Sequence, residues 1–259
     1  MSCAIITITT HGLLVAKKLQ ETLNGDLYAP KNIINDNNSN ISAYETTTKE
    51  LIEKLWKRYN SFIFIMALGI VTRLIKDHIQ DKFKDPAVVV VDEMGRYAIS
   101  ALSGHEGGAN RLAEKAALIC RGDFVITTGS EATKTLIAGM GCRRGTSTIQ
   151  LEETLLEGLK QINRNVNEVR LIASVEDKKD EKGFFQLSEK LNIPLKFISK
   201  SLIKTVEDNF TKSEIVKKSL GIYSVAEPCA ILGGFRCQMV LPKTKFSQTT
   251  IAIAEEKFS

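Results

Sequence analysis

Short apolar runs rich in β-branched residues alternate with amphipathic stretches along the chain, and this alternation constrains the fold more than any other feature. Residues 61–66 and 87–91 are two such runs, in which every residue except Ser61 is apolar. Between the runs the apolar residues follow a helical spacing, as in residues 46–59. Strands that alternate with helices favour an α/β fold with a mainly parallel sheet flanked by helices.

The pattern runs twice through the 259 residues, which are enough for two modest domains. We expect one α/β domain over residues 1–129 and a second over residues 134–259. In the first we expect strands at 3–9, 61–66, 87–91 and 97–102, helices at 13–23, 46–59, 73–79 and 109–119, a turn at 11–12 and a mobile loop at 31–42. The strands at 87–91 and 97–102 flank a turn at 92–95, which predicts a hairpin. In the second we expect strands at 136–140, 169–173, 195–198, 238–241 and 249–254, and helices opening at Ser147 and over 182–191, 213–220 and 225–232. Ser147 is the expected N-cap of its helix, with Gln150 as its capping-box partner.

Composition excludes several classes of protein. No apolar run reaches the length of a membrane span. The first residues have no basic region before their apolar stretch, so they resemble a first strand more than a signal peptide. The five cysteines are scattered without metal-ligand spacing, so we expect reduced thiols, no metal site and a cytoplasmic location. A net charge of +5 gives little support to nucleic acid as a partner and fits a polyanionic small molecule as well.

The most glycine-rich turn of the chain lies between the predicted strand 97–102 and the predicted helix 109–119. Its glycines allow close backbone approach to a ligand, and the following helix start offers unpaired N–H groups to an anion. The spacing fits neither a dinucleotide-binding fingerprint nor a phosphate-binding Walker loop. Turns of this kind that bind no ligand are about as frequent as turns that bind one, so a purely structural turn stays open. The residues concerned are Ser103, Gly104, His105, Gly107, Gly108 and Asn110.

Two further strand ends carry polar residues. Within residues 62–73, an apolar run is followed by Gly69 and Arg73. Within residues 85–96, an apolar run ends at a turn that contains Asp92, Glu93 and Arg96. Together with the glycine-rich turn, these segments resemble the amino-terminal domain of CbiG, the cobalamin-biosynthesis family of cobalt-precorrin-5A hydrolases. Residues 139–147, 224–232 and 249–254 are similar to the carboxy-terminal domain of that family.

The resemblance covers nearly the whole chain, with one departure. Many members of the family carry a middle segment between the two domains. Here only residues 120–134 separate the two matching parts, which is too little for a domain.

The resemblance implies a substrate and a reaction. The substrate is cobalt-precorrin-5A, a cobalt-bearing macrocycle with many carboxylate arms and a δ-lactone. The reaction opens the lactone with water and expels acetaldehyde, giving cobalt-precorrin-5B. It needs no further cofactor, because the cobalt arrives inside the substrate. Neighbouring precorrin methyltransferases are the expected protein partners.

Lactone opening needs a base for water and a donor for the developing oxyanion. His105 is the first candidate for proton transfer because histidine titrates near neutral pH, although a structural role in its loop stays open. Asp92 and Glu93 follow a strand, where α/β sheets place ligands, and the alternative for them is a turn-forming pair.

For the carboxylate arms, guanidinium groups and helix starts are the expected partners. In the first domain, Gly69, Arg73 and Arg96 are candidates, with surface solvation as the alternative for the two arginines. Asn110 is a candidate to orient the lactone carbonyl, with capping of the following helix as the alternative. In the second domain the candidates form a basic strand-to-helix turn, which could instead be solvated: Gly141, Arg143, Arg144, Gly145, Thr146 and Ser147. Glu227 is a further candidate for substrate binding, although helix capping is the stronger interpretation there. We expect the substrate in a cleft lined by residues 69–73, 92–96, 104–110 and 141–147.

Two alternatives stay open at this point. A non-catalytic protein that binds a corrinoid intermediate and transfers it to a methyltransferase would use the same anion-binding loops. A generic anion-binding regulatory protein would share only descent with the family.

Overall fold

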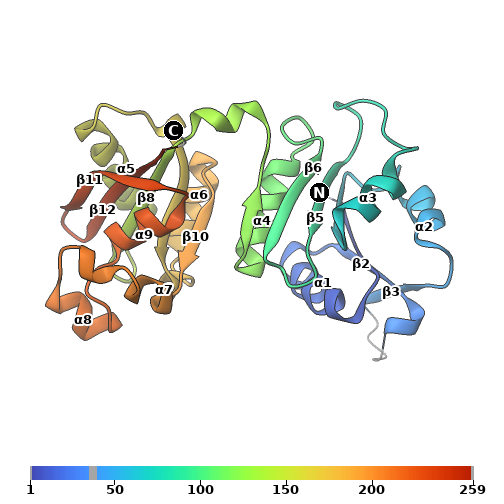
Figure 1. The fold of residues 1–259 in the computed structure, drawn as a ribbon, viewed down its shortest axis with the longest axis horizontal. Coiled ribbons are helices and arrows are strands. Elements are labelled where there is room, and N and C mark those ends of the chain that lie inside the picture. The colour runs from blue at the N-terminus through green and yellow to red at the C-terminus, as the bar shows by residue number, and fades with distance from the viewer. Residues whose placement is uncertain (1, 35–39, 258–259) are drawn as a thin grey trace. The chain divides into compact units, whose positions relative to one another are not determined.

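Seven strands from the first half of the chain assemble into one sheet in the order β3-β2-β1-β4-β5-β6-β7, and five from the second half assemble into another in the order β10-β9-β8-β12-β11. The computed structural model describes residues 2–34 and 40–257. Contacts divide the chain into two compact units, Met1–Thr128 and Gly129–Ser259 (Figure 1).

The first unit contains the following elements: β1 Cys3–Thr7, α1 Thr10–Leu23, β2 Asp26–Pro30, β3 Ile41–Tyr44, α2 Thr48–Leu55, β4 Ser61–Ile65, α3 Leu68–Ile75, β5 Ala87–Val91, β6 Tyr97–Leu102, α4 Ala109–Cys120 and β7 Asp123–Val125. All pairings in its sheet are parallel except that of β5 with β6, which is antiparallel. The mainly parallel sheet predicted for this half is therefore confirmed, as is the hairpin of β5 and β6.

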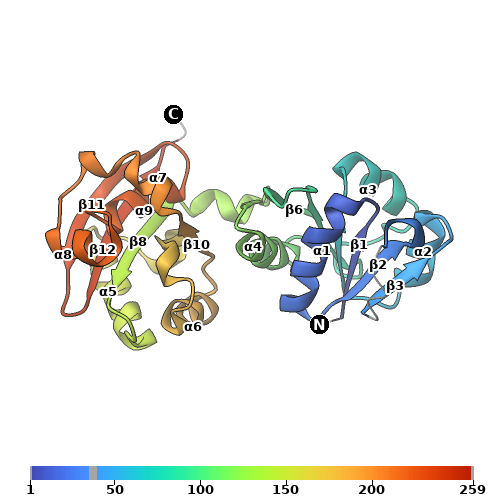
Figure 2. The same ribbon diagram turned by 90° about the horizontal axis from the view of Figure 1, so that it is seen from below.

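Helices cover both faces of this sheet. Cys3 and Ile5 of β1 pack with α1 and α4, which lie side by side over one face (Figure 2). Ala4 and Ile6 of the same strand pack with α2 and α3 on the other face. A strand buried on both faces reads as a continuous apolar run, which explains the sequence of β1, β4 and β5.

The order of the strands creates a crevice. The chain moves outward from β1 to β2 and β3, then returns to the other side of β1 with β4. The helices that follow β1 and β4 consequently start on opposite faces, and their strand ends meet at a topological switch point, where open α/β sheets bind ligands. Thr7, Ile65 and Val91 end the adjacent strands β1, β4 and β5 and lie in register.

Several elements of the first unit differ from expectation. His11 and Gly12 do not form a turn; they lie in the first turn of α1, where the Thr9 side chain accepts a hydrogen bond from the Gly12 N–H at 3.1 Å. Helix α3 begins at Leu68, five residues before the predicted start. The short strands β2, β3 and β7 were not predicted, because none carries a long apolar run.

The predicted mobile loop at 31–42 is also wrong where it can be compared. Lys31–Ile33 form a 3-10 helix, and β3 begins at Ile41. The expectation for residues 35–39 falls outside the described residues.

The second unit contains β8 Leu136–Cys142, α5 Thr148–Gln161, β9 Val169–Val175, α6 Lys182–Leu191, β10 Leu195–Ile198, α7 Lys200–Lys204, α8 Glu214–Leu220, α9 Ala226–Gly233, β11 Cys237–Lys245 and β12 Thr249–Glu256. The β10–β9 and β9–β8 pairings are parallel, whereas β8–β12 and β12–β11 are antiparallel. The sheet is flanked by helices as predicted, but it is mixed, because the closing pair enters it through β12 beside β8.

Helix α9 lies directly against β8. A Cβ atom on Gly139 would stand 2.0 Å from the Ala226 carbonyl oxygen and 2.5 Å from the Ala230 nitrogen. Glycine at this position therefore lets the backbone of a helix approach the backbone of a strand.

Candidate active site

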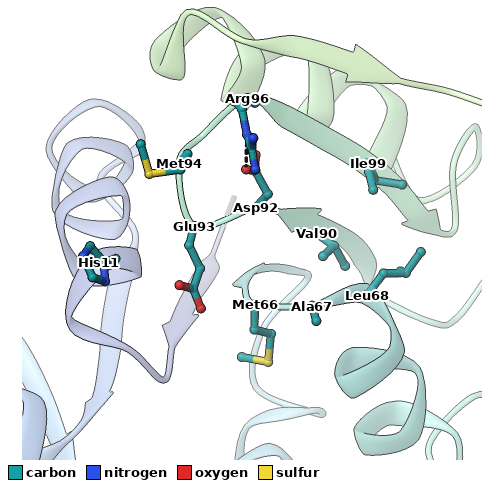
Figure 3. Close-up of a pocket in the computed structure, with 10 residues that line it drawn as sticks. All are labelled: His11, Met66, Ala67, Leu68, Val90, Asp92, Glu93, Met94, Arg96 and Ile99. Carbon is teal, nitrogen blue, oxygen red and sulfur yellow. Dashed lines mark hydrogen bonds and ion pairs between the residues drawn. The ribbon is translucent and has the colours of Figure 1, made fainter.

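A pocket of about 530 Å³ opens at the switch point of the first unit. Its lining comes from the ends of β4 and β5, the starts of α1, α3 and β6, and the turn between β5 and β6 (Figure 3). The residues that line it are His11, Met66, Ala67, Leu68, Val90, Asp92, Glu93, Met94, Arg96 and Ile99. Three of the sequence candidates, Asp92, Glu93 and Arg96, therefore belong to one pocket.

Asp92 is engaged within its own turn. Its carboxylate accepts hydrogen bonds from the Tyr97 N–H and from Nε of Arg96, each at 2.9 Å. Partial burial alone would raise the pKa of Asp92, but these hydrogen bonds outweigh burial and lower the pKa. Asp92 is thus held as a carboxylate that shapes the turn and pairs with Arg96, which makes it a poor acceptor of protons at neutral pH.

Glu93 differs from its neighbour. It is half-buried, and within residues 2–34 and 40–257 its side chain has no hydrogen bond or ion pair. Figure 3 shows its carboxylate directed into the space between α1, which carries His11, and the segment of Met66 and Ala67. It is a carboxylate available to a ligand in the pocket.

The rest of the lining is largely apolar. Leu68 and Met94 are 43% and 68% exposed, so their side chains are accessible to a ligand. Helix α3 starts here without a side-chain cap on its first N–H groups. Met66, Leu68 and Met94 were not among the sequence candidates; their signal was their position close to the ends of the strand runs.

The glycine-rich turn with His105 lies elsewhere. Because β6 is antiparallel to β5, its last residue, Leu102, pairs with Val88 near the start of β5. The segment 103–110 therefore follows β6 at the sheet edge opposite the pocket. The expectation that residues 92–96 and 104–110 line one cleft is wrong, because the hairpin carries the chain across the sheet between them.

The glycines of this turn are explained by packing within the turn itself. A Cβ on Gly107 would stand 2.4 Å from Cβ of Ser103, and one on Gly104 would stand 2.8 Å from Oδ1 of Asn110. Ser103 adopts a positive φ of 54°, and its hydroxyl donates to the Asp85 carbonyl at 3.1 Å. Gly108 has a φ of 85° and precedes α4. The turn is a closely packed loop from which His105 is exposed.

Asn110 is buried and its amide is used inside the unit. Oδ1 accepts from the Ser100 hydroxyl at 2.8 Å, and Nδ2 donates to the Thr128 hydroxyl at 3.0 Å. These bonds join β6 to the end of the unit, which favours a structural role over contact with a lactone carbonyl.

Gly69 and Arg73 lie in helix α3 and not in a loop. Arg73 is exposed, and its Nη1 donates to the Gly69 carbonyl one turn earlier at 2.9 Å. Gly69 lies in the first turn of the helix that borders the pocket and Arg73 in its last turn, and neither lines the pocket.

In the second unit, the predicted basic turn follows β8 and precedes α5. Arg143 and Arg144 are exposed, while the buried Thr146 donates to the Arg143 carbonyl at 2.8 Å. Ser147 caps α5 in a capping box with Gln150, as predicted. The Gly145 N–H already donates to the Glu181 carboxylate at 2.9 Å. Gly141 belongs to β8, and its carbonyl accepts from the Thr250 hydroxyl at 3.4 Å.

Glu227 is buried in the first turn of α9, but it does not cap that helix. Its two carboxylate oxygens accept from the backbone N–H groups of Thr211 at 3.2 Å and Lys243 at 3.3 Å. It ties two neighbouring segments together, and both of its oxygens are occupied.

A reactive thiol at Cys142 and a cluster of metal-ligating side chains would be two further sources of chemistry. Burial raises the pKa of the Cys142 thiol, so the thiol is not an activated nucleophile. In the described part of the chain no three His, Cys, Asp or Glu side chains are placed to hold a metal ion. Nor is any helix there long and apolar enough to cross a membrane.

Both halves of the chain match signatures of one known protein family. The signature described as "Cobalamin synthesis G N-terminal" matches residues 50–131, and "Cobalamin synthesis G C-terminus" matches residues 136–254. The chain belongs to the CbiG family. Within it, Asp92, Glu93 and His105 lie inside the amino-terminal match, and His11 precedes that match.

Two relatives match this chain along most of their length. A cobalt-precorrin-5A hydrolase of Priestia megaterium is 25% identical over 352 aligned positions, covering 97% of this chain and 94% of the relative. One of Salmonella typhimurium is 25% identical, with 89% and 91% covered. The first alignment is longer than the 259 residues of this CbiG chain, so that relative contains residues with no counterpart here. The crystal structure of CobE, a protein from the cobalamin biosynthetic pathway, is 32% identical over 48% of this chain and 91% of its own, with a TM-score of 0.45.

Proposed function

We propose that this chain is a cobalt-precorrin-5A hydrolase of cobalamin biosynthesis. The observation that carries the proposal is the match of both halves to the two CbiG signatures, together with relatives of that name along nearly the whole chain. The substrate is cobalt-precorrin-5A, and the products are cobalt-precorrin-5B and acetaldehyde.

Each unit contains groups that suit a part of this substrate. The first unit has a pocket with an available carboxylate and apolar walls, which suits a macrocycle that carries a lactone. The second unit has two exposed guanidinium groups, Arg143 and Arg144, which suit carboxylate arms. His105, on the far edge of the first sheet, stays a candidate that the same substrate can test.

The decisive experiment is incubation of the full chain with cobalt-precorrin-5A and an assay for acetaldehyde. We expect acetaldehyde in a one-to-one ratio with substrate consumed, and a changed absorbance spectrum of the macrocycle. Tight binding without acetaldehyde would contradict hydrolysis and favour the alternative, a protein that binds the intermediate and passes it to a methyltransferase.

A further inference from the structure

We propose that Glu93, with His11 across the pocket, is the proton-transfer centre of this enzyme; the inference rests on the proposed function and names the residues that perform it. The two side chains belong to different elements, the β5–β6 turn and the first turn of α1. Both line the switch-point pocket, as Figure 3 shows.

Glu93 is favoured over its neighbour because the turn assigns the two carboxylates different partners. Asp92 accepts hydrogen bonds from Arg96 and from the Tyr97 backbone, which hold it ionised and in place. Within the described residues the Glu93 carboxylate has no such partner. The ionisable groups that line the pocket are His11, Asp92, Glu93 and Arg96, so Glu93 and His11 are the pair left for proton transfer.

The surroundings of this pair fit a reacting lactone. Helices α1 and α3 both begin at the pocket, and the positive ends of their dipoles favour negative charge that develops on a carbonyl oxygen. Leu68, Met94 and Ile99 provide apolar surface for a flat ring. A polar centre with apolar walls is the usual composition of a small-molecule site.

The first step opens the lactone. The Glu93 carboxylate accepts a proton from water as the water oxygen bonds to the lactone carbonyl carbon. The acyl carbon–oxygen bond then breaks, and the protonated His11 imidazole donates its proton to the departing oxygen. The products of this step are a free carboxyl group and a hydroxyl group on the two-carbon fragment.

The second step releases acetaldehyde and restores both residues. His11 takes the hydroxyl proton back, the carbon–oxygen bond becomes a carbonyl, and the bond between the fragment and the ring breaks. The electron pair of that bond stays on the ring carbon, which takes up the proton held by Glu93. One water is consumed, and no oxidant or reductant is needed.

The test compares single-turnover acetaldehyde release by full-length variants, with binding followed separately by the absorbance of the macrocycle. We expect Glu93→Gln and His11→Asn each to slow release by roughly 10²–10⁴-fold with little change in binding. Glu53→Gln removes an exposed carboxylate from α2 and should behave as the wild type. Glu93→Ala should regain part of its rate when sodium formate is added, a result that a structural role would not produce.

The other outcomes separate this inference from the proposed function. Wild-type release by Glu93→Gln would overturn the inference and leave the function standing, and a loss in His105→Asn alone would assign proton transfer to the opposite edge. No acetaldehyde from the wild type would overturn both. Thermal unfolding of each variant checks the fold, and Glu93→Asp, which keeps the charge but shortens the side chain, should give an intermediate rate.

Discussion

Asp92 and Glu93 are adjacent in the chain, yet the turn between β5 and β6 gives them different roles. Asp92 supports the turn through the Tyr97 N–H and the Arg96 guanidinium. Glu93 lines the pocket without a partner among the described residues. The sequence predicted that this pair lies at a strand end, but not which carboxylate the turn uses, because that depends on backbone geometry that apolar periodicity does not encode.

The lowered pKa of Asp92 predicts a pH-dependent contribution to stability. Because the folded state holds Asp92 below its unfolded pKa, its contribution is fully present above the unfolded value and is lost as pH falls through the folded value. Asp92→Asn should lower the free energy of unfolding by about 1–2 kcal/mol at pH 7, and by less as pH approaches 3. Urea unfolding of both proteins across this range measures the difference. A difference that does not change with pH would contradict the assignment.

Arg143 and Arg144 predict a moderate effect on binding. Both are exposed, so each contact with a carboxylate arm is worth about 0.2–1 kcal/mol. The double variant Arg143→Ala with Arg144→Ala should therefore weaken binding of cobalt-precorrin-5A roughly 2- to 30-fold, and less at high salt. Absorbance titration measures it, and Lys57→Ala with Arg58→Ala removes two exposed charges from the other unit as a control. Equal affinities in both double variants would exclude this turn as a site for the arms.

At the scale of elements, the sequence was most informative where apolar runs were long. Strand β5 has the predicted bounds, β4 ends one residue before its predicted end, and the β5–β6 hairpin forms as expected. That hairpin already implied that the segment after β6 lies at the opposite edge from Asp92, a consequence that reading each motif separately does not reveal. The short strand β7 and the place of β12 beside β8 depend on tertiary pairing, which local patterns do not specify.

The contact of α9 with β8 predicts a large effect from one methyl group. Gly139→Ala would place Cβ 2.0 Å and 2.5 Å from two backbone atoms of α9, so the helix must move away from the sheet. We expect a loss of roughly 2–4 kcal/mol in the free energy of unfolding of the second unit. Gly129→Ala, where a Cβ has nothing within 4 Å, should change it by less than about 0.5 kcal/mol. Denaturant unfolding of both variants compares them, and similar stabilities would show that α9 adjusts freely.

For the whole molecule, two sheets in two compact units predict two folding units. Fragments 1–128 and 129–259 should each give a cooperative unfolding transition and dispersed amide NMR signals, since each retains all strands of its sheet. A fragment ending at residue 122 is the control for the first unit. It lacks β7, which pairs with β6, and should be less stable. If fragment 1–128 lacked a cooperative transition, the first unit would depend on the second for its fold.

Because β6 runs antiparallel to β5, it also sets a fixed distance between two positions of the first unit. The six residues of this strand span about 20 Å, so positions 93 and 105 mark the two ends of one sheet. A pair of spin labels or fluorophores placed there reports on the distance between the two ends of that sheet. A ligand bound near position 93 should quench the label there and not the label at position 105. Quenching of one label alone therefore shows which end of the sheet the ligand occupies.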